Sequence, residues 1–122
     1  MTDISGFGLA SHLGDICMSS NVSADLDLKE EILINKNLEI LKDFKSTGFD
    51  NNMNAMKQYV SISNKSNFEK ILYDPQTNGA MLMVINPDQR LNFENKFFNE
   101  CGYAPLLIGK FTDLKNKIIN CN

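Results

Sequence analysis

A switch in apolar periodicity near the start of the chain constrains the fold most. One helix face would carry Leu9, Leu13, Ile16 and Cys17. Residues 22–28 instead alternate between apolar and polar side chains, as a strand with one buried face does. An amphipathic helix followed at once by a half-buried strand requires helices layered on a sheet. The pattern predicts an α+β fold, in which a mixed sheet is packed with helices.

The remaining elements continue this mixture of helices and strands. Helices are expected after Asn35, over 53–59 and after Pro87, with a polar loop at 48–54, and strands at 60–62, 81–85, 104–111 and 117–119. Residues 81–85 are continuously apolar, which predicts a strand buried on both faces. The helix that Asn86 would cap is expected to bury a stripe of Leu91, Phe97, Phe98 and Cys101, and to end at Gly102.

The length and charge of the chain exclude several classes of protein. Its 122 residues are typical of a single domain spanning 1–122. Twelve basic residues against fifteen acidic ones, with Arg90 as the sole arginine, provide no basic surface for nucleic acid or anionic lipid. No apolar run approaches the roughly 20 residues of a membrane span. The first residues have no signal-peptide pattern, so a cytoplasmic location is expected.

The cysteines and the single histidine do not predict a structural metal site. Cys17, Cys101 and Cys121 are widely spaced, and His12 is the only histidine. No zinc set of the usual spacing can be formed from these four residues. We expect free thiols in a reducing compartment.

The first segment that could carry chemistry is Thr2–Gly8. Asp3 precedes two glycines at the expected start of a helix, and such a carboxylate can bind Mg²⁺ together with substrate phosphates. Free N–H groups at that helix start could bind an anion. The alternative is that Asp3 only caps the helix and the glycines form a tight turn. Thr2 or Ser5 could also be the cap, and Gly8 predicts a close backbone approach.

The second such segment is Asp74–Gly79. Side-chain oxygens of Asp74, Gln76 and Thr77 surround a turn that leads into the apolar run at 81–85. The segment could be a polar contact loop, or an Asp-Pro turn without a ligand.

Other residues give weaker signals. His12 could act as a general base, but no Ser or Cys partner follows from the sequence, which favours a structural role. Lys110 is equally well explained as a solvated lysine. The methionines Met53, Met56, Met81 and Met83 are expected to fill the core. No Walker loop or dinucleotide-binding glycine pattern is present.

The two polar segments together resemble a known family. Residues 2–13, TDISGFGLASHL, resemble the TDVTGFGLLGHL segment of the selenophosphate synthetase (selenide, water dikinase) family, and residues 74–80, DPQTNGA, resemble its DPQTSGG segment. The order and the spacing of about 70 residues also agree. The resemblance continues through the strand at 81–85 and the Pro87 helix to the Gly102-Tyr103 and Ile108-Gly109 pairs.

The resemblance implies the C-terminal domain of an aminoimidazole ribonucleotide synthetase-like fold. The full enzyme would make selenophosphate from ATP, selenide and water, releasing AMP and phosphate, as a Mg²⁺-dependent homodimer. A missing N-terminal domain would supply the reactive Cys or selenocysteine, a lysine, and most ATP and metal ligands. Asp3 matches the family's metal-binding aspartate, and no catalytic residue is expected in this chain. The chain alone would then be inactive and bind neither ATP nor Mg²⁺ tightly.

Two substitutions and two alternatives stay open. Asn78 and Ala80 replace a serine and a glycine of the family motif, and Ala resists the positive φ that Gly tolerates. A ligand role for Thr77 and Asn78 is therefore less well supported. The alternatives are a stand-alone, non-catalytic domain that binds a ligand or partner, and part of another ATP-dependent enzyme of the same superfamily.

Overall fold

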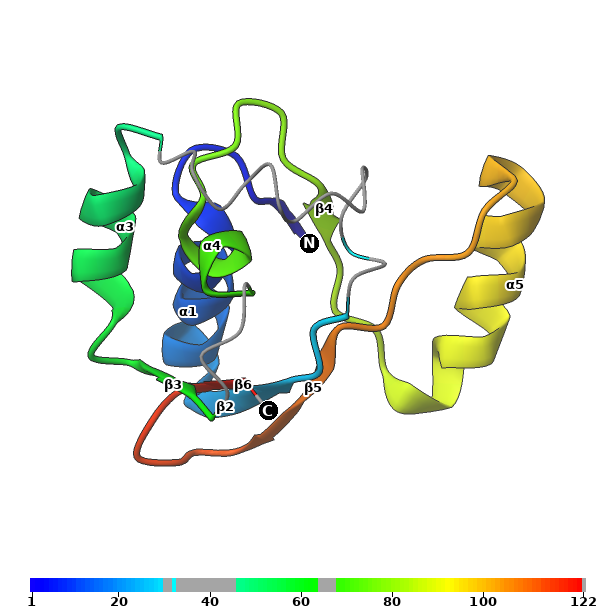
Figure 1. The fold of residues 1–122 in the computed structure, drawn as a ribbon. Coiled ribbons are helices and arrows are strands. Elements are labelled where there is room, and N and C mark those ends of the chain that lie inside the picture. The colour runs from blue at the N-terminus through cyan, green and yellow to red at the C-terminus, as the bar shows by residue number, and fades with distance from the viewer. Residues whose placement is uncertain (30–31, 33–45, 64–67, 122) are drawn as a thin grey trace.

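The computed structural model describes residues 1–29, 32, 46–63 and 68–121. Figure 1 shows the elements in order: β1 (Thr2–Asp3), α1 (Gly8–Ser20), β2 (Val22–Leu26), α3 (Phe49–Met56), β3 (Val60–Ile62), α4 (Phe68–Tyr73), β4 (Met81–Leu82), a 3-10 turn (Pro87–Gln89), α5 (Arg90–Cys101), β5 (Gly109–Asp113) and β6 (Ile119–Cys121). The helix predicted after Asn35 lies outside the described residues.

A four-stranded mixed sheet has the order β3-β6-β2-β5. Strand β2 runs parallel to β6, with Ala24 opposite Ile119, and antiparallel to β5, with Ala24 opposite Phe111. Strand β6 is also parallel to β3. A mixed sheet with helices confirms the predicted α+β fold.

The core lies between this sheet and the helices α1, α3 and α4, which stand on one side of it (Figure 1). It is built by Leu9, Ala10, Leu13, Cys17, Ala24, Leu26, Leu28, Phe49, Met56, Val60, Leu72, Tyr73, Ile118, Ile119 and Cys121. The predicted stripe of α1 is confirmed for Leu9, Leu13 and Cys17. We call the sheet and these three helices the body.

The burial of strand β2 contains an exception to strict alternation. Ser23 is fully buried, although it falls on the polar side of the pattern. Its hydroxyl accepts a hydrogen bond from the Lys115 backbone N–H at 2.8 Å and donates to the Lys117 carbonyl at 3.2 Å. These two bonds satisfy the hydroxyl, which makes its burial tolerable.

The prediction of a strand buried on both faces at 81–85 is wrong. Only Met81–Leu82 form a strand, β4, which pairs with β1 in a two-stranded antiparallel sheet. Met81 is 53% exposed and Val84 is 48% exposed. A continuous apolar run is buried on both faces only where other layers cover both, and the described residues provide no such cover here.

The predicted buried stripe of α5 is also wrong. No residue of α5 is buried, and Leu91 and Phe98 are among its most exposed apolar side chains. The helix projects away from the body (Figure 1). Residues 83–107, which contain α5, are called the arm below.

Local signals, not core packing, define α5. The Asn86 side chain accepts a hydrogen bond from the Asp88 N–H at 3.0 Å, and Gly102 ends the helix at φ 78°. The end at Gly102 was predicted, whereas Asn86 caps the 3-10 turn that leads into α5, and Gln89, the cap residue of α5 itself, makes no side-chain cap bond. Ring contacts of Phe97 with Phe93 and Tyr103, at centroid distances of 5.8 and 5.4 Å, add to its stability.

Three element boundaries differ from the prediction. Helix α3 begins at Phe49, inside the expected polar loop, because Phe49, Asn52 and Met56 form one buried face at helical spacing. The last two strands lie at Gly109–Asp113 and Ile119–Cys121, a few residues after their predicted positions. Asn21 ends α1 in the left-handed conformation.

Candidate functional site

The two polar segments singled out in the sequence lie against each other. The Ile4 N–H donates to the Ala80 carbonyl at 3.0 Å, and the Gly6 N–H donates to the Gln76 carbonyl at 2.7 Å. The Gly79 N–H donates to the Ser5 hydroxyl at 3.1 Å. Residues 4–6 and 74–80 are therefore one hydrogen-bonded unit, which we call the paired loops.

Two glycines permit this close approach. A Cβ on Gly79 would lie 2.6 Å from the carbonyl carbon of Ile4, closer than real Cβ contacts. A Cβ on Gly8 would lie 2.8 Å from the Leu72 carbonyl oxygen, and Gly8 also has a φ of +77°. The close approach predicted for Gly8 is confirmed, with α4 as the element approached.

Side chains from two helices hold the first of the paired loops. The Asn52 amide of α3 donates to the carbonyls of Gly6 at 3.2 Å and Tyr73 at 3.1 Å. The Nε2 atom of His12 on α1 lies 3.1 Å from the Ser5 carbonyl oxygen. That contact supports the structural interpretation of His12.

The predicted cap of α1 is not formed by Thr2 or Ser5. Phe7 is the cap residue and makes no side-chain cap bond. The Ser5 hydroxyl accepts from Gly79 instead, and the Thr2 hydroxyl donates to the neighbouring Asp3 carbonyl at 3.0 Å. The local sequence favoured a cap, but the second loop uses the Ser5 hydroxyl.

Asp3, the predicted metal ligand, is exposed on β1, opposite Met81. Within the described residues, no group of three or more His, Cys, Asp or Glu side chains could hold a metal ion by itself. An exposed single carboxylate still suits Mg²⁺, which usually takes one or two protein carboxylates and completes its shell with phosphates and water. Asp3 thus fits as one ligand of a shared site, and its metal role stays a prediction.

The polar side chains of the second loop are half-buried or exposed. Asp74 accepts a hydrogen bond from the Ser46 hydroxyl at 3.3 Å. Thr77 and Asn78 are exposed. Ala80 is not among the positive-φ residues, so the substitution of the family's glycine causes no backbone strain.

The remaining candidates show no catalytic arrangement. The three cysteines are free; Cys17 and Cys121 are buried, and Cys101 is exposed. Burial raises the pKa of the Cys121 thiol to about 11 and also raises the pKa of Cys17. A raised pKa makes both thiols poor nucleophiles at neutral pH.

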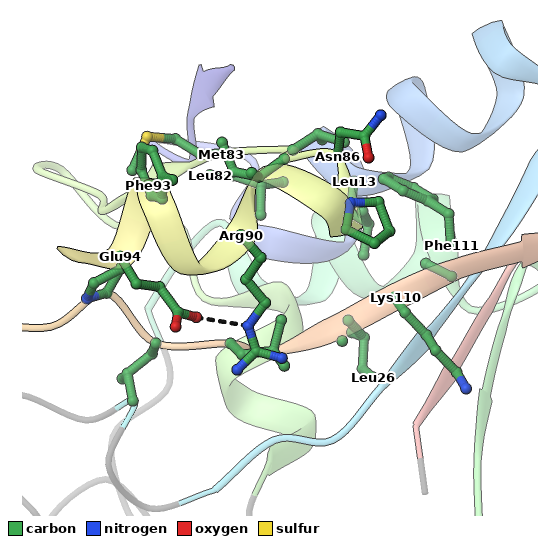
Figure 2. Close-up of a pocket in the computed structure, with 18 residues that line it drawn as sticks. Leu13, Leu26, Leu82, Met83, Asn86, Arg90, Phe93, Glu94, Lys110 and Phe111 are labelled. Atoms are coloured by element: carbon green, nitrogen blue, oxygen red, sulfur yellow. Dashed lines mark hydrogen bonds and ion pairs between the residues drawn. The ribbon is translucent and has the colours of Figure 1, made fainter. Parts of the chain in front are cut away.

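An open apolar groove of about 600 Å³ lies between the arm and the body (Figure 2). Leu13 and Leu26 of the body and Phe93 of α5 are among its lining residues. Arg90 and Glu94 form an ion pair on α5 at 2.7 Å, and Lys110 also lines the groove.

The methionines were predicted to fill the core. That prediction is wrong for Met81, which is exposed, and confirmed for Met56, which is buried.

Asn52 is the residue of the site that the sequence analysis missed. The segment around it looked like a polar loop, so a buried amide was not expected there. The available signal was its spacing, because Phe49, Asn52 and Met56 recur at intervals of three and four residues. A polar residue in the middle of such a stripe has to find buried hydrogen-bond partners.

Comparisons with known proteins identify the family to which the chain is similar. Residues 1–121 match the family described as AIR synthase related protein, C-terminal domain. A selenide, water dikinase of Haemophilus ducreyi is 32% identical over 115 residues, which cover 93% of this chain and 32% of that protein. A selenide, water dikinase of Yersinia pestis is 35% identical over 92 residues, covering 72% and 25%. The chain thus spans about a third or less of the length of these relatives.

These matches confirm the resemblance to selenophosphate synthetase that the two motifs indicated. No helix in the described ranges is long and apolar enough to cross a membrane. The α+β fold, the paired motif loops and the match over nearly every residue all lead to the same assignment: the chain belongs to the family of AIR synthase related proteins, as their C-terminal domain.

Proposed function

We propose that this chain serves as the C-terminal domain of an enzyme that makes selenophosphate from ATP, selenide and water, with release of AMP and phosphate. The observation that carries the proposal is the pairing of the two motif segments into one hydrogen-bonded unit beside Asp3. The relatives named selenide, water dikinase support the choice of reaction.

In this proposal Asp3 contributes one carboxylate to a Mg²⁺ that also binds the phosphates of ATP. A bound Mg²⁺ would neutralise charge on the transferring phosphoryl group. The chain's own contribution is positional: β1 pairs with β4 and places Asp3 at the exposed edge of the paired loops. The reactive nucleophile and most ATP ligands would come from an N-terminal domain, within a cytoplasmic homodimer.

The test is selenide-dependent AMP release by a protein that joins this chain to its N-terminal, ATP-binding domain. We expect AMP release from the joined protein and none from residues 1–122 alone. Absence of AMP release from the joined protein, or turnover by the 122 residues alone, would contradict the proposal.

Asp3→Asn provides the sharper test, because it removes the charge and preserves the shape of the side chain. We expect the Mg²⁺ concentration for half-maximal activity to rise at least tenfold. Asp113→Asn is the matched control, since Asp113 is another exposed strand carboxylate and lies on β5. Equal Mg²⁺ dependence of Asp3→Asn and wild type would remove Asp3 from the site.

A further inference from the structure

We propose that Asn52 is a positioning residue that fixes the paired loops to each other and thereby fixes Asp3. The part of this inference that concerns a metal rests on the proposed function. The part that concerns the loops rests on the geometry of α3 alone.

The Asn52 side chain lies between Gly6, at the end of the first loop, and Tyr73, the last residue of α4, from which the second loop continues. It is 7% exposed, and its Nδ2 atom is 3.2 Å from the Gly6 carbonyl oxygen and 3.1 Å from the Tyr73 carbonyl oxygen. Gly6 belongs to the first loop, and Tyr73 directly precedes Asp74 of the second. Carbonyls only accept hydrogen bonds, so the NH₂ group has to face them; one hydrogen binds the first loop, and the other binds the α4 residue from which the second loop continues.

Helix α3 holds this amide firmly in place. Phe49 and Met56 are buried on the same helix face, one turn before and one turn after Asn52. The Phe49 ring meets the Tyr73 ring edge-on at a centroid distance of 5.9 Å. The amide is therefore anchored by packing on both sides, and one of its two acceptors, Tyr73, also packs against α3.

Asp3 depends on this arrangement because four of the six backbone N–H and C=O groups of residues 4–6 are bound by the second loop, His12 or Asn52. The N–H groups of Ile4 and Gly6 bind the second loop, and the Ser5 and Gly6 carbonyls face His12 and Asn52. Replacing a residue that orients a metal ligand through hydrogen bonds commonly lowers the metal affinity 10- to 100-fold. Asn52 would act in that way through the backbone of residues 4–6.

The experiment compares Asn52→Leu with Asn51→Leu in the joined protein. Leu has the same branched shape as Asn, is larger, and donates no hydrogen bond, and Asn51 is an exposed residue of the same helix. The first readout is amide hydrogen exchange of peptides covering residues 3–9 and 76–80. The second is Mn²⁺ binding measured by electron paramagnetic resonance, and the third is the Mg²⁺ dependence of AMP release.

We expect Asn52→Leu to speed exchange at least tenfold in both peptides, including the Gly79 amide, which does not contact Asn52. Mn²⁺ binding and the half-saturating Mg²⁺ concentration should each weaken about tenfold, with Asn51→Leu unchanged. A purely structural role would lower the maximal rate and leave the metal dependence as in wild type, and that result would overturn the proposal. Unchanged exchange at 76–80 would also overturn it.

Failure of the proposed function gives a different result. A joined protein without selenide-dependent AMP release would contradict that function, and the exchange measurement would still decide whether Asn52 couples the loops. If Asn52→Leu does not fold, Asn52→Ala takes its place, because its smaller side chain avoids crowding and lets water reach the two carbonyls.

Discussion

The body and the arm both contain a helix with apolar residues at helical spacing, but only the body buries them. On α1, Leu9, Leu13 and Cys17 are at most 4% exposed. On α5, Leu91 is 73% exposed and Phe98 is 54% exposed. Periodicity therefore predicted both helices correctly, and it predicted burial correctly for one. Whether a stripe is buried depends on a partner surface, which the spacing within one helix does not report.

The largest expected effect separates the two regions by a matched substitution. Leu9→Ala should lower the free energy of unfolding by about 2–5 kcal/mol, because it leaves a cavity in the close-packed core. Leu91→Ala should change it by less than about 0.5 kcal/mol, as exposed positions usually do. Denaturant unfolding of both variants measures the difference, and comparable losses would show that α5 is packed in solution.

The second prediction compares two glycines with nearly equal φ, one in each region. Gly8 has φ +77° and Gly102 has φ +78°, but only a Cβ on Gly8 would meet backbone, at 2.8 Å. Gly102→Ala should cost about 1 kcal/mol through its φ alone. Gly8→Ala should cost about 3 kcal/mol, because the steric contact adds to the same strain. Equal losses in denaturant unfolding would mean that α4 yields to the added methyl group.

A third prediction uses pH, since the buried thiols with raised pKa values belong to the body. Burial raises the pKa of Cys121 from 9.0 to about 11, so the unfolded chain loses this proton first as the pH rises. Stability should be unaffected by this group below pH 9 and fall between pH 9 and 11, by on the order of 1 kcal/mol at pH 10. Tyr73, whose pKa burial raises to about 12, extends the loss above pH 10.

The control for the pH prediction is Cys121→Ala. This variant should be less stable at pH 7, because it loses a buried side chain, and its stability should fall less between pH 9 and 10. A slope equal to that of wild type would assign the alkaline loss to other groups. Urea unfolding at pH 7, 9 and 10 provides the three points required.

The smallest expected effect belongs to the arm. Arg90 and Glu94 form an ion pair one helical turn apart at 2.7 Å, and Arg90 is about half exposed. Arg90→Ala should cost about 0.3–0.5 kcal/mol, and salt should reduce this difference further. A loss above about 1.5 kcal/mol would mean that Arg90 also stabilises the groove seen in Figure 2.

The sequence predicted the elements best where local rules decide the outcome. Asn86 caps the 3-10 turn before α5, and Gly102 ends α5, as the residue types of these two positions predict. The prediction failed at 81–85, because burial on both faces needs other layers of the structure. It also failed at 49–54, where exposed Asn and Asp side chains on the outer face of α3 concealed its buried face.

The site was predictable in its parts and not in its contacts. The two loop segments were found from their residue types, and Gly8 was correctly expected to meet backbone. The pairing of Ser5 with Gly79, residues separated by most of the chain, left no local signal. Asn52 is different, since its spacing with Phe49 and Met56 indicated a buried position, but the two carbonyls that its amide binds could be found only from the structure.

The short pairing of β1 with β4 has a consequence for how the chain folds. Thr2 pairs with Leu82, so forming this sheet closes a loop of about 80 residues. Such closure costs about 4 kcal/mol of chain entropy, and two short strands return little in exchange. Contacts of high sequence separation form slowly unless earlier structure shortens the loop. We therefore expect the body to fold first and the segment that presents Asp3 to dock last.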